Sequence, residues 1–171
     1  MGKSSKSNLW IILKYKSFGV SVSEKSLKHQ VGDFLKKRWS GNFNELVGIE
    51  FVDASKDFAK MRLPLKSEIL QPTGILHGGA IFSLMDCTGG VAAHLSYPGQ
   101  NLVTLEMKVN FIRPVSSGFV IAETSPLHRG RKTSVWEIKV NDEETRIVAF
   151  ATATYMVAST PAKKNIFPVF E

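Results

Sequence analysis

The middle of the chain holds an almost wholly apolar segment that follows a loop at residues 71–77. Its apolar positions recur three and four residues apart, and this spacing predicts a helix over residues 78–95. The flanking positions are also small or apolar, so we expect the helix to be buried on nearly all sides. Asp86 lies in its middle and is the only formally charged residue between Glu68 and Glu106. Burying a carboxylate costs free energy, so its presence in an apolar helix indicates a specific role. Asp86 is therefore the first candidate functional residue.

A period of two replaces the helical spacing in the rest of the chain. Alternating apolar and polar residues predict a strand at 103–111 whose apolar side is covered. The apolar set is Val103, Leu105, Met107, Val109 and Phe111, and Thr104 belongs to the polar set. A further helix is predicted over residues 27–39, preceded by a cap at 23–26. Other strands are expected at 46–52, 58–65, 118–127, 133–141 and 146–157, with a hairpin loop at 53–57 and a turn at 141–144.

This order of elements favours an α+β fold in which an antiparallel sheet covers, or wraps around, one long apolar helix. Helices do not alternate with strands, which argues against a doubly wound nucleotide-binding domain. A chain of 171 residues is long enough for one domain with a substantial core. We assign residues 25–158 to this domain, residues 1–24 to a basic N-terminal extension and residues 159–171 to an irregular C-terminal tail.

The net charge of +7 is confined to the start of the chain. Residues 1–40 hold nine basic residues (Lys and Arg) but only two acidic residues (Asp and Glu), whereas residues 41–171 hold 13 basic and 13 acidic residues. The main body is therefore neutral, and we expect no nucleic-acid partner for it. The basic extension is either a plain tail or peripheral strand, or a segment for membrane-surface or organelle targeting.

Cysteine content and hydropathy limit the class of protein. The single Cys87 excludes an intramolecular disulfide and a multi-cysteine zinc site, which fits a reducing compartment. The apolar segment Leu9–Leu13 is shorter than a secretory signal core, and no apolar run approaches the roughly 20 residues that span a bilayer. We therefore expect a cytoplasmic protein with no metal site and no stable membrane insertion.

Two motifs carry a resemblance to a known family. Residues 74–86 contain His77-Gly78-Gly79 with an acid nine positions after the histidine, and residues 103–114 end in Asn-Phe-Ile-Arg-Pro. Together they resemble the hotdog-fold acyl-CoA thioesterases of the phenylacetate-degradation (PaaI-like) type, over about residues 30–157. The resemblance implies a hotdog fold, with an antiparallel sheet wrapped around the central helix, and the helix predicted from the pattern at 27–39 is an additional N-terminal helix. It also implies a homodimer or homotetramer whose site lies at the subunit interface.

The implied activity is hydrolysis of an acyl- or aryl-acyl-CoA to the free acid and CoA. No cofactor is implied, because CoA is part of the substrate. Gly78 falls at the position of the oxyanion hole, where a backbone N–H at a helix N-terminus meets the charge that develops on the carbonyl oxygen. Asp86 falls at the position of the carboxylate that acts either as general base toward water or as nucleophile.

Three more residues belong to the site by this resemblance, and each has a structural alternative. Thr104 occupies a position near the attacking water but is equally an ordinary strand residue. His77 either positions the turn or carries a proton, and Gln71 either places water or substrate or braces the loop. The family commonly has Asn at Gln71, while a branch acting on hydroxybenzoyl-CoA has Gln together with Glu as the acid. The pairing of Gln71 with Asp86 therefore leaves the subgroup and the substrate open.

The remaining candidates have weaker support. Asp86 itself has a structural alternative, the capping of buried backbone groups, and Cys87 lacks an implied base and is expected to be a small buried residue. A basic set would contact the CoA phosphates, unless its loop is simply a solvated turn; its members are Arg113, Arg129, Arg131 and Lys132. Two other functions stay open, a non-catalytic acyl-CoA sensing module and a hotdog acyl-thioester dehydratase.

Overall fold

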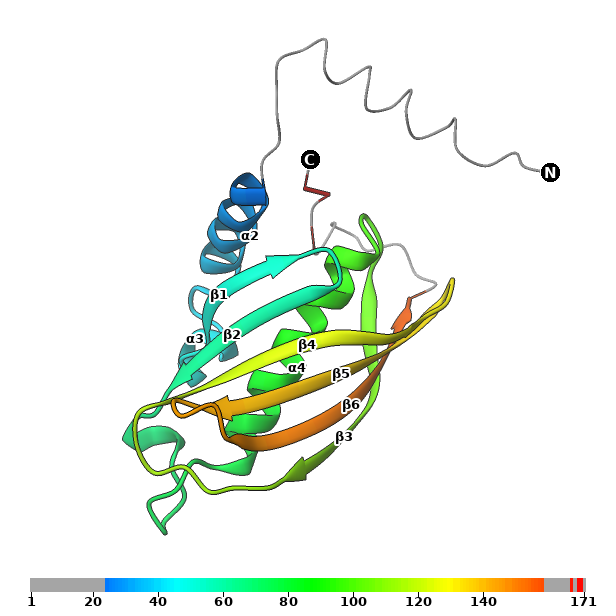
Figure 1. Ribbon diagram of the computed structural model, residues 1–171. Coiled ribbons are helices and arrows are strands. Elements are labelled where there is room, and N and C mark those ends of the chain that lie inside the picture. The colour runs from blue at the N-terminus through cyan, green and yellow to red at the C-terminus, as the bar shows by residue number, and fades with distance from the viewer. Residues whose placement is uncertain (1–23, 159–166, 168, 171) are drawn as a thin grey trace, which may run out of the picture.

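A single antiparallel sheet curves around one long helix (Figure 1). The computed structural model describes residues 24–158, 167, 169 and 170. The strands lie in the order β1-β2-β4-β5-β6-β3. In chain order the elements are α2 (Glu24–Trp39), α3 (Phe43–Val47), β1 (Glu50–Ser55), β2 (Phe58–Pro64), the 3-10 turn η1 (Ser67–Ile69), α4 (Gly78–Ser96), β3 (Leu102–Phe111), β4 (Phe119–Arg129), β5 (Thr133–Asp142) and β6 (Ile147–Val157).

The predicted α+β class is confirmed, with the antiparallel sheet packed against one apolar helix as in the hotdog fold. The central helix and the four strands after it begin and end within two residues of the predicted positions. The division into extension, domain and tail is a prediction about residues 1–23 and most of 159–171, which lie outside the described residues. None of the described helices is long and apolar enough to cross a membrane.

Burial of α4 follows from its apolar surface. Leu84 and Met85 have no exposed area, and the concave face of the sheet covers them with side chains such as Trp136, Ile138 and Tyr155. β5 illustrates the alternation that produces this face, because Ser134, Trp136, Ile138, Val140 and Asp142 are buried while the residues between them are not. α4 and the inner face of the sheet therefore form one core.

The first predicted strand begins too early, because residues 43–47 form the short helix α3. The Asn42 side chain accepts a hydrogen bond from Asn44 N–H and caps this helix, and Gly48 ends it with a φ of 93°. Leu46, which the prediction placed in the strand, is instead exposed. The predicted hairpin loop is also too long, since β1 continues through Ser55.

The two edges of the sheet differ in what covers them. α2 packs beside β1 (Figure 1), and its side chains Val31 and Leu35 are buried. β3 is the terminal strand at the opposite edge, and no described element pairs with its outer side. Val103, Leu105 and Phe111 on this strand are 44%, 52% and 57% exposed. An edge strand with unpaired backbone groups and exposed apolar side chains is a surface suited to pairing with another chain.

Candidate active site

The loop before α4 is held by bonds between its own backbone groups. Gln71 N–H donates to the Ile75 carbonyl at 2.7 Å, and the Gln71 carbonyl accepts from Gly74 N–H at 2.8 Å. Gly74 has a φ of 80°, which glycine adopts without strain. His77 N–H then donates to the Ile69 carbonyl at 2.9 Å, which anchors the end of the loop. The main chain of Gln71 thus helps to hold the loop, and the role of its side chain stays a prediction.

The start of α4 presents a backbone donor. His77 caps the helix, with Nδ1 accepting a hydrogen bond from Gly79 N–H at 2.8 Å, so its proton must lie on Nε2 when the ring is neutral. Among the described residues, no group accepts a hydrogen bond from Gly78 N–H, one of the donors that a helix start leaves unpaired. The helix dipole adds positive potential at the same point. The cap fixes the orientation of the His77 ring, and Gly78 N–H is left as a donor at the positive end of the helix.

Asp86 and Thr104 lie side by side, although 18 residues separate them in the chain. Thr104 Oγ1 donates a hydrogen bond to Asp86 Oδ1 at 2.9 Å. Asp86 is half-buried and Thr104 is exposed, so this pair lies at the rim of the core rather than inside it. The hydrogen bond orients the carboxylate and leaves its second oxygen with unused acceptor capacity. That arrangement suits a carboxylate that takes a proton from water or attacks a carbonyl carbon.

A β-bulge places Thr104 next to Asp86, and the alternation predicted for this strand is wrong at its start. Thr104 pairs with Tyr155 and Glu106 with Thr154, which leaves Leu105 as the extra residue. Thr104 therefore shares the helix-facing side with Met107, while Val103 and Leu105 are exposed instead of covered. A strict period of two would have turned Thr104 away from α4.

Gly78 and Asp86 do not meet within one chain. They are eight residues apart on α4, and a rise of 1.5 Å per residue separates them by about 12 Å along the helix axis. The ring of Phe111 lies against Gly78, because a Cβ added there would be 3.3 Å from Phe111 Cζ. One end of β3 therefore adjoins the donor and the other end adjoins the carboxylate.

Two further ionisable groups lie beside Asp86. Burial, reinforced by the charge of Asp86, raises the pKa of the Cys87 thiol well above its ordinary value, so the reactive thiolate is absent at neutral pH. Burial, together with Asp86 and Cys87, also raises the pKa of Tyr155. Tyr155 donates a weak hydrogen bond of 3.4 Å to the Asp86 carbonyl. Neither group is therefore suited to act as nucleophile or base.

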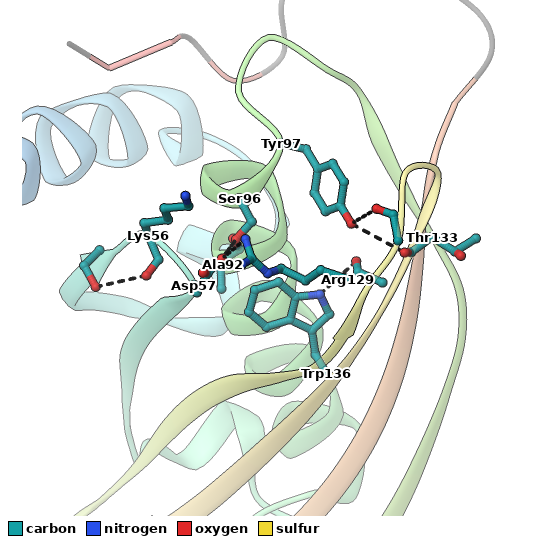
Figure 2. Close-up of polar contacts among 11 residues, drawn as sticks. Lys56, Asp57, Ala92, Ser96, Tyr97, Arg129, Thr133 and Trp136 are labelled. Carbon is teal, nitrogen blue, oxygen red and sulfur yellow. Dashed lines mark hydrogen bonds and ion pairs between the residues drawn. The ribbon is translucent and has the colours of Figure 1, made fainter. Parts of the chain in front are cut away.

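The four basic candidates do not form one cluster within the chain. Arg129 Nη1 pairs with Asp57 Oδ1 at 2.9 Å, and the same oxygen accepts from Ser96 Oγ at 2.6 Å (Figure 2). Tyr97 Oη donates to the Gly130 carbonyl at 2.7 Å, so the β4–β5 loop is tied to the C-terminal end of α4.

Arg131 and Lys132 are exposed on this loop. Arg113 follows the C-terminal end of β3, which lies beside the N-terminus of α4 and away from this loop.

A groove beside Asp86 was not predicted. It has a volume of about 260 Å³ and runs between α2 and α4. Asp86, Gly90 and His94 line it and are spaced four residues apart on α4. Gly90 was the available signal, since a glycine within a helix costs stability unless open space is needed beside it. Elsewhere, no three His, Cys, Asp or Glu side chains of the described residues come close enough to hold a metal ion.

The chain is similar to known proteins in sequence and in fold. A family model described as "Thioesterase superfamily" matches residues 73–149. The chain is 35% identical to the 1,4-dihydroxy-2-naphthoyl-CoA hydrolase of Escherichia coli over 115 residues, 67% of this chain and 85% of that protein. It is 34% identical to the proofreading thioesterase EntH of Cronobacter turicensis over 120 residues, 70% and 88% of the two chains. In fold, it matches the E. coli PaaI protein of the phenylacetic acid degradation operon with a TM-score of 0.70 at 22% identity, covering 80% of this chain and 99% of that one.

Proposed function

This chain belongs to the thioesterase superfamily and is a thioester hydrolase, and on that premise we propose that it hydrolyses an acyl- or aryl-acyl-CoA to the free acid and CoA. The hydrogen bond from Thr104 to Asp86, at the rim of the groove, is the observation that carries the proposal. It holds the one carboxylate of α4 where an acyl group can reach it. The CoA-thioester activity named for the E. coli relative supports the same substrate class.

In the proposed reaction, Asp86 supplies the base or the nucleophile. Its free oxygen either takes a proton from water that attacks the thioester carbonyl, or attacks that carbon itself. Gly78 N–H donates to the oxygen that becomes negatively charged as the carbon becomes tetrahedral. The C–S bond then breaks, and CoA leaves as a thiolate, because a thiol pKa of about 8.5 makes protonation of the leaving group unnecessary. Where Asp86 is the nucleophile, water then hydrolyses the resulting acyl–Asp86 anhydride, which releases the free acid and restores the carboxylate. The reaction requires no cofactor.

Two subunits are needed to build this site. A hydrogen-bond donor and a base that act on one carbonyl group must each lie within about 3 Å of the reacting atoms, and Gly78 and Asp86 of one α4 are too far apart. We therefore propose a homodimer in which Gly78 of one subunit faces Asp86 of the other. Association of two such dimers into a homotetramer stays a prediction.

The exposed edge of β3 is the surface that supports this dimer. If two β3 edges pair antiparallel across a two-fold axis, the Thr104 end of one strand meets the Phe111 end of the other. Asp86 is bonded to Thr104, and Gly78 lies against Phe111, so the same operation brings the carboxylate of one subunit toward the donor of its partner. The exposed Val103, Leu105 and Phe111 become covered in such an assembly.

The same dimer accounts for the separated basic residues. Thr133 lies across β6 from Val103, since both pair with Met156. The loop that carries Arg131 and Lys132 therefore lies near the Thr104 end of β3, and antiparallel pairing brings Arg113 of the partner to that end. We propose that these exposed cations bind the CoA phosphates at the mouth of the composite site. Arg129 is paired with Asp57 and contributes mainly to the structure of the loop.

The first experiment measures CoA thiol release from a panel of aliphatic and aromatic acyl-CoAs. We expect turnover by the parent protein and a loss of at least 100-fold in kcat for Asp86→Asn, since the base and nucleophile are both removed. Thr104→Val, which keeps the shape but loses the hydroxyl, should lower kcat by roughly tenfold or more, the magnitude of a hydrogen bond to a charged group. Thr104→Ser retains the hydroxyl and should retain most of the activity.

Asp33→Asn is the matched control, because Asp33 is exposed on α2 and does not line the groove. Undiminished turnover by folded Asp86→Asn would contradict the role given to Asp86. Tight binding of acyl-CoA by a parent protein that releases no thiol would favour an acyl-CoA sensing module. Addition or loss of water on an unsaturated or hydroxylated acyl group, without thiol release, would favour a dehydratase.

A further inference from the structure

The groove beside Asp86 has the shape of a pocket for an acyl group. Its α4 wall carries no large side chain at Gly90, where an added Cβ would meet no atom within 4 Å. Its α2 wall is formed by residues that include Phe34, Leu35 and Trp39. The groove thus joins a carboxylate at one end to apolar and aromatic walls, the composition expected around the acyl part of a thioester.

An aromatic pair closes the far end of this groove. The rings of His94 and Phe167 are stacked, with centroids 5.1 Å apart and an angle of 26° between their planes. Phe167 also packs edge-to-face on Phe34 of α2, at a centroid distance of 4.9 Å. Phe167 comes from the C-terminal segment and is only 8% exposed. It therefore bridges the two helical walls and seals the space between them.

A second cavity lies behind the aromatic pair. It has a volume of about 310 Å³ and is lined by residues of α2, α4 and the C-terminal segment, including Leu27, Leu95 and Phe170. His94 lines both cavities, whereas Phe167 lines only the first and Phe170 only the second. His94 is therefore the residue that the two cavities share, and Phe167 stacks on it from the side of the first.

His94 is an uncharged ring whose orientation is fixed by a bond within α4. His94 Nδ1 lies 2.7 Å from the Gly90 carbonyl, which can only accept, so Nδ1 carries the proton. His94 Nε2 is buried and has no partner among the described residues. Burial lowers the pKa of His94, although the bond to Gly90 acts in the opposite direction, and the ring is therefore neutral at physiological pH.

We propose that Phe167, stacked on His94, is the floor of the acyl pocket and limits the length of the acyl group that the enzyme accepts. This assignment rests on the thioesterase function proposed above. Asp86 and His94 are separated by about 12 Å along α4 at 1.5 Å per residue, which gives room for a medium-chain or two-ring aryl acyl group. Longer chains meet the ring of Phe167. Acyl length is thus set by a residue far from Asp86 in the sequence.

The test measures kcat/KM for saturated acyl-CoAs of increasing chain length with the parent protein, Phe167→Ala and Phe170→Ala. Phe170 is the matched control, because it packs on the same two rings, Phe34 and Phe167, but lines only the second cavity. Phe167→Ala should prefer a longer acyl chain than the parent protein does. Its kcat/KM for longer acyl-CoAs should rise about fourfold for each additional methylene group that becomes buried. Phe170→Ala should keep the parental preference. Phe167→Leu, which keeps an apolar side chain but is shorter than Phe and therefore also deepens the pocket, replaces Phe167→Ala if that variant does not fold.

An unchanged chain-length preference in folded Phe167→Ala or Phe167→Leu would overturn the proposal. So would an equal lengthening in Phe170→Ala, since that result would indicate general loosening of the aromatic cluster. If the parent releases no thiol from any acyl-CoA, the proposed function fails, and the pocket is tested by binding alone with non-hydrolysable thioether analogues. A gain in affinity for longer analogues in Phe167→Ala then supports the floor, and equal affinities in parent and variant refute it.

Discussion

Gly89 and Gly90 are neighbours on α4 with opposite surroundings. A Cβ at Gly89 would clash with Tyr155 Oη and lie 3.2 Å from Ile138 Cδ1, whereas a Cβ at Gly90 would meet nothing within 4 Å. Gly89→Ala should lower the free energy of unfolding by roughly 1–2 kcal/mol, since the clash outweighs the gain in helix propensity. Gly90→Ala should raise it by about 0.5–1 kcal/mol. Denaturant unfolding of both variants measures these changes.

Tyr155→Phe provides the control for this pair. Removing the hydroxyl opens the space that the Gly89→Ala methyl group needs, so the cost of that substitution should be smaller in the Tyr155→Phe background. Equal costs in both backgrounds would show that the close approach of Tyr155 is not why glycine is needed. At the residue scale, the two glycines thus have different functions in one helix. Gly89 allows tight packing against Tyr155, and Gly90 leaves the groove open.

At the scale of an element, the β5–β6 hairpin is organised by Asp142. Its Oδ1 accepts from Glu144 N–H at 3.0 Å and Arg146 N–H at 2.9 Å, and its Oδ2 accepts from Arg146 Nε at 2.8 Å. Burial alone would raise the pKa of Asp142, but the hydrogen bonds and charge of Arg146 outweigh it and hold the pKa below its ordinary value. Thr145 keeps a φ of 61° within this turn.

This lowered pKa predicts a pH-dependent stability. The ionised form of Asp142 stabilises the folded state above the ordinary pKa of about 3.9, and that contribution is lost as the pH falls through the lower folded-state value. The difference in unfolding free energy between the parent and Asp142→Asn should therefore be constant above about pH 5 and shrink toward strong acid. Glu143→Gln, at an exposed carboxylate of the same turn, should show no such trend. Denaturant titrations at several pH values test this, and a difference that grows toward acid would contradict it.

At the scale of the whole molecule, the composite site predicts complementation between two inactive variants. Gly78→Pro removes the N–H donor at the first helical position, where proline is tolerated. His77, with φ −66° and ψ 134°, already has the backbone that precedes proline. Asp86→Asn removes the carboxylate. In a heterodimer of the two, one composite site contains both intact groups.

Co-refolding equal amounts of the two variants should therefore restore roughly a quarter of the parental activity, because half of the random dimers carry one intact site of two. Each variant refolded alone should stay inactive, and circular dichroism should show that both are folded. No recovery in a mixture that demonstrably forms heterodimers would mean that the donor and the carboxylate act within one subunit. Leu105→Lys, placed on the exposed edge of β3, should weaken association and lower activity in parallel.

The sequence by itself determined the elements and the candidate carboxylate. The spacing of apolar residues in 78–95 and the period of two that follows are local patterns, and a helix or strand forms from neighbours in the chain. Asp86 was recognisable because it interrupts a long uncharged stretch, and the motif around His77 indicated the family. The short helix α3 was missed, because Leu46 and Val47 belong to an apolar run that also suits a strand.

Only the tertiary structure decided which of these residues meet. The bulge at Leu105 is a property of the pairing between β3 and β6, so no period within β3 could reveal that Thr104 turns toward Asp86. The groove exists because α2 lies across from the Gly90 face of α4, and Phe167 closes it from more than 70 residues away. Contacts between distant segments depend on how whole elements pack, which alternation along one segment does not encode.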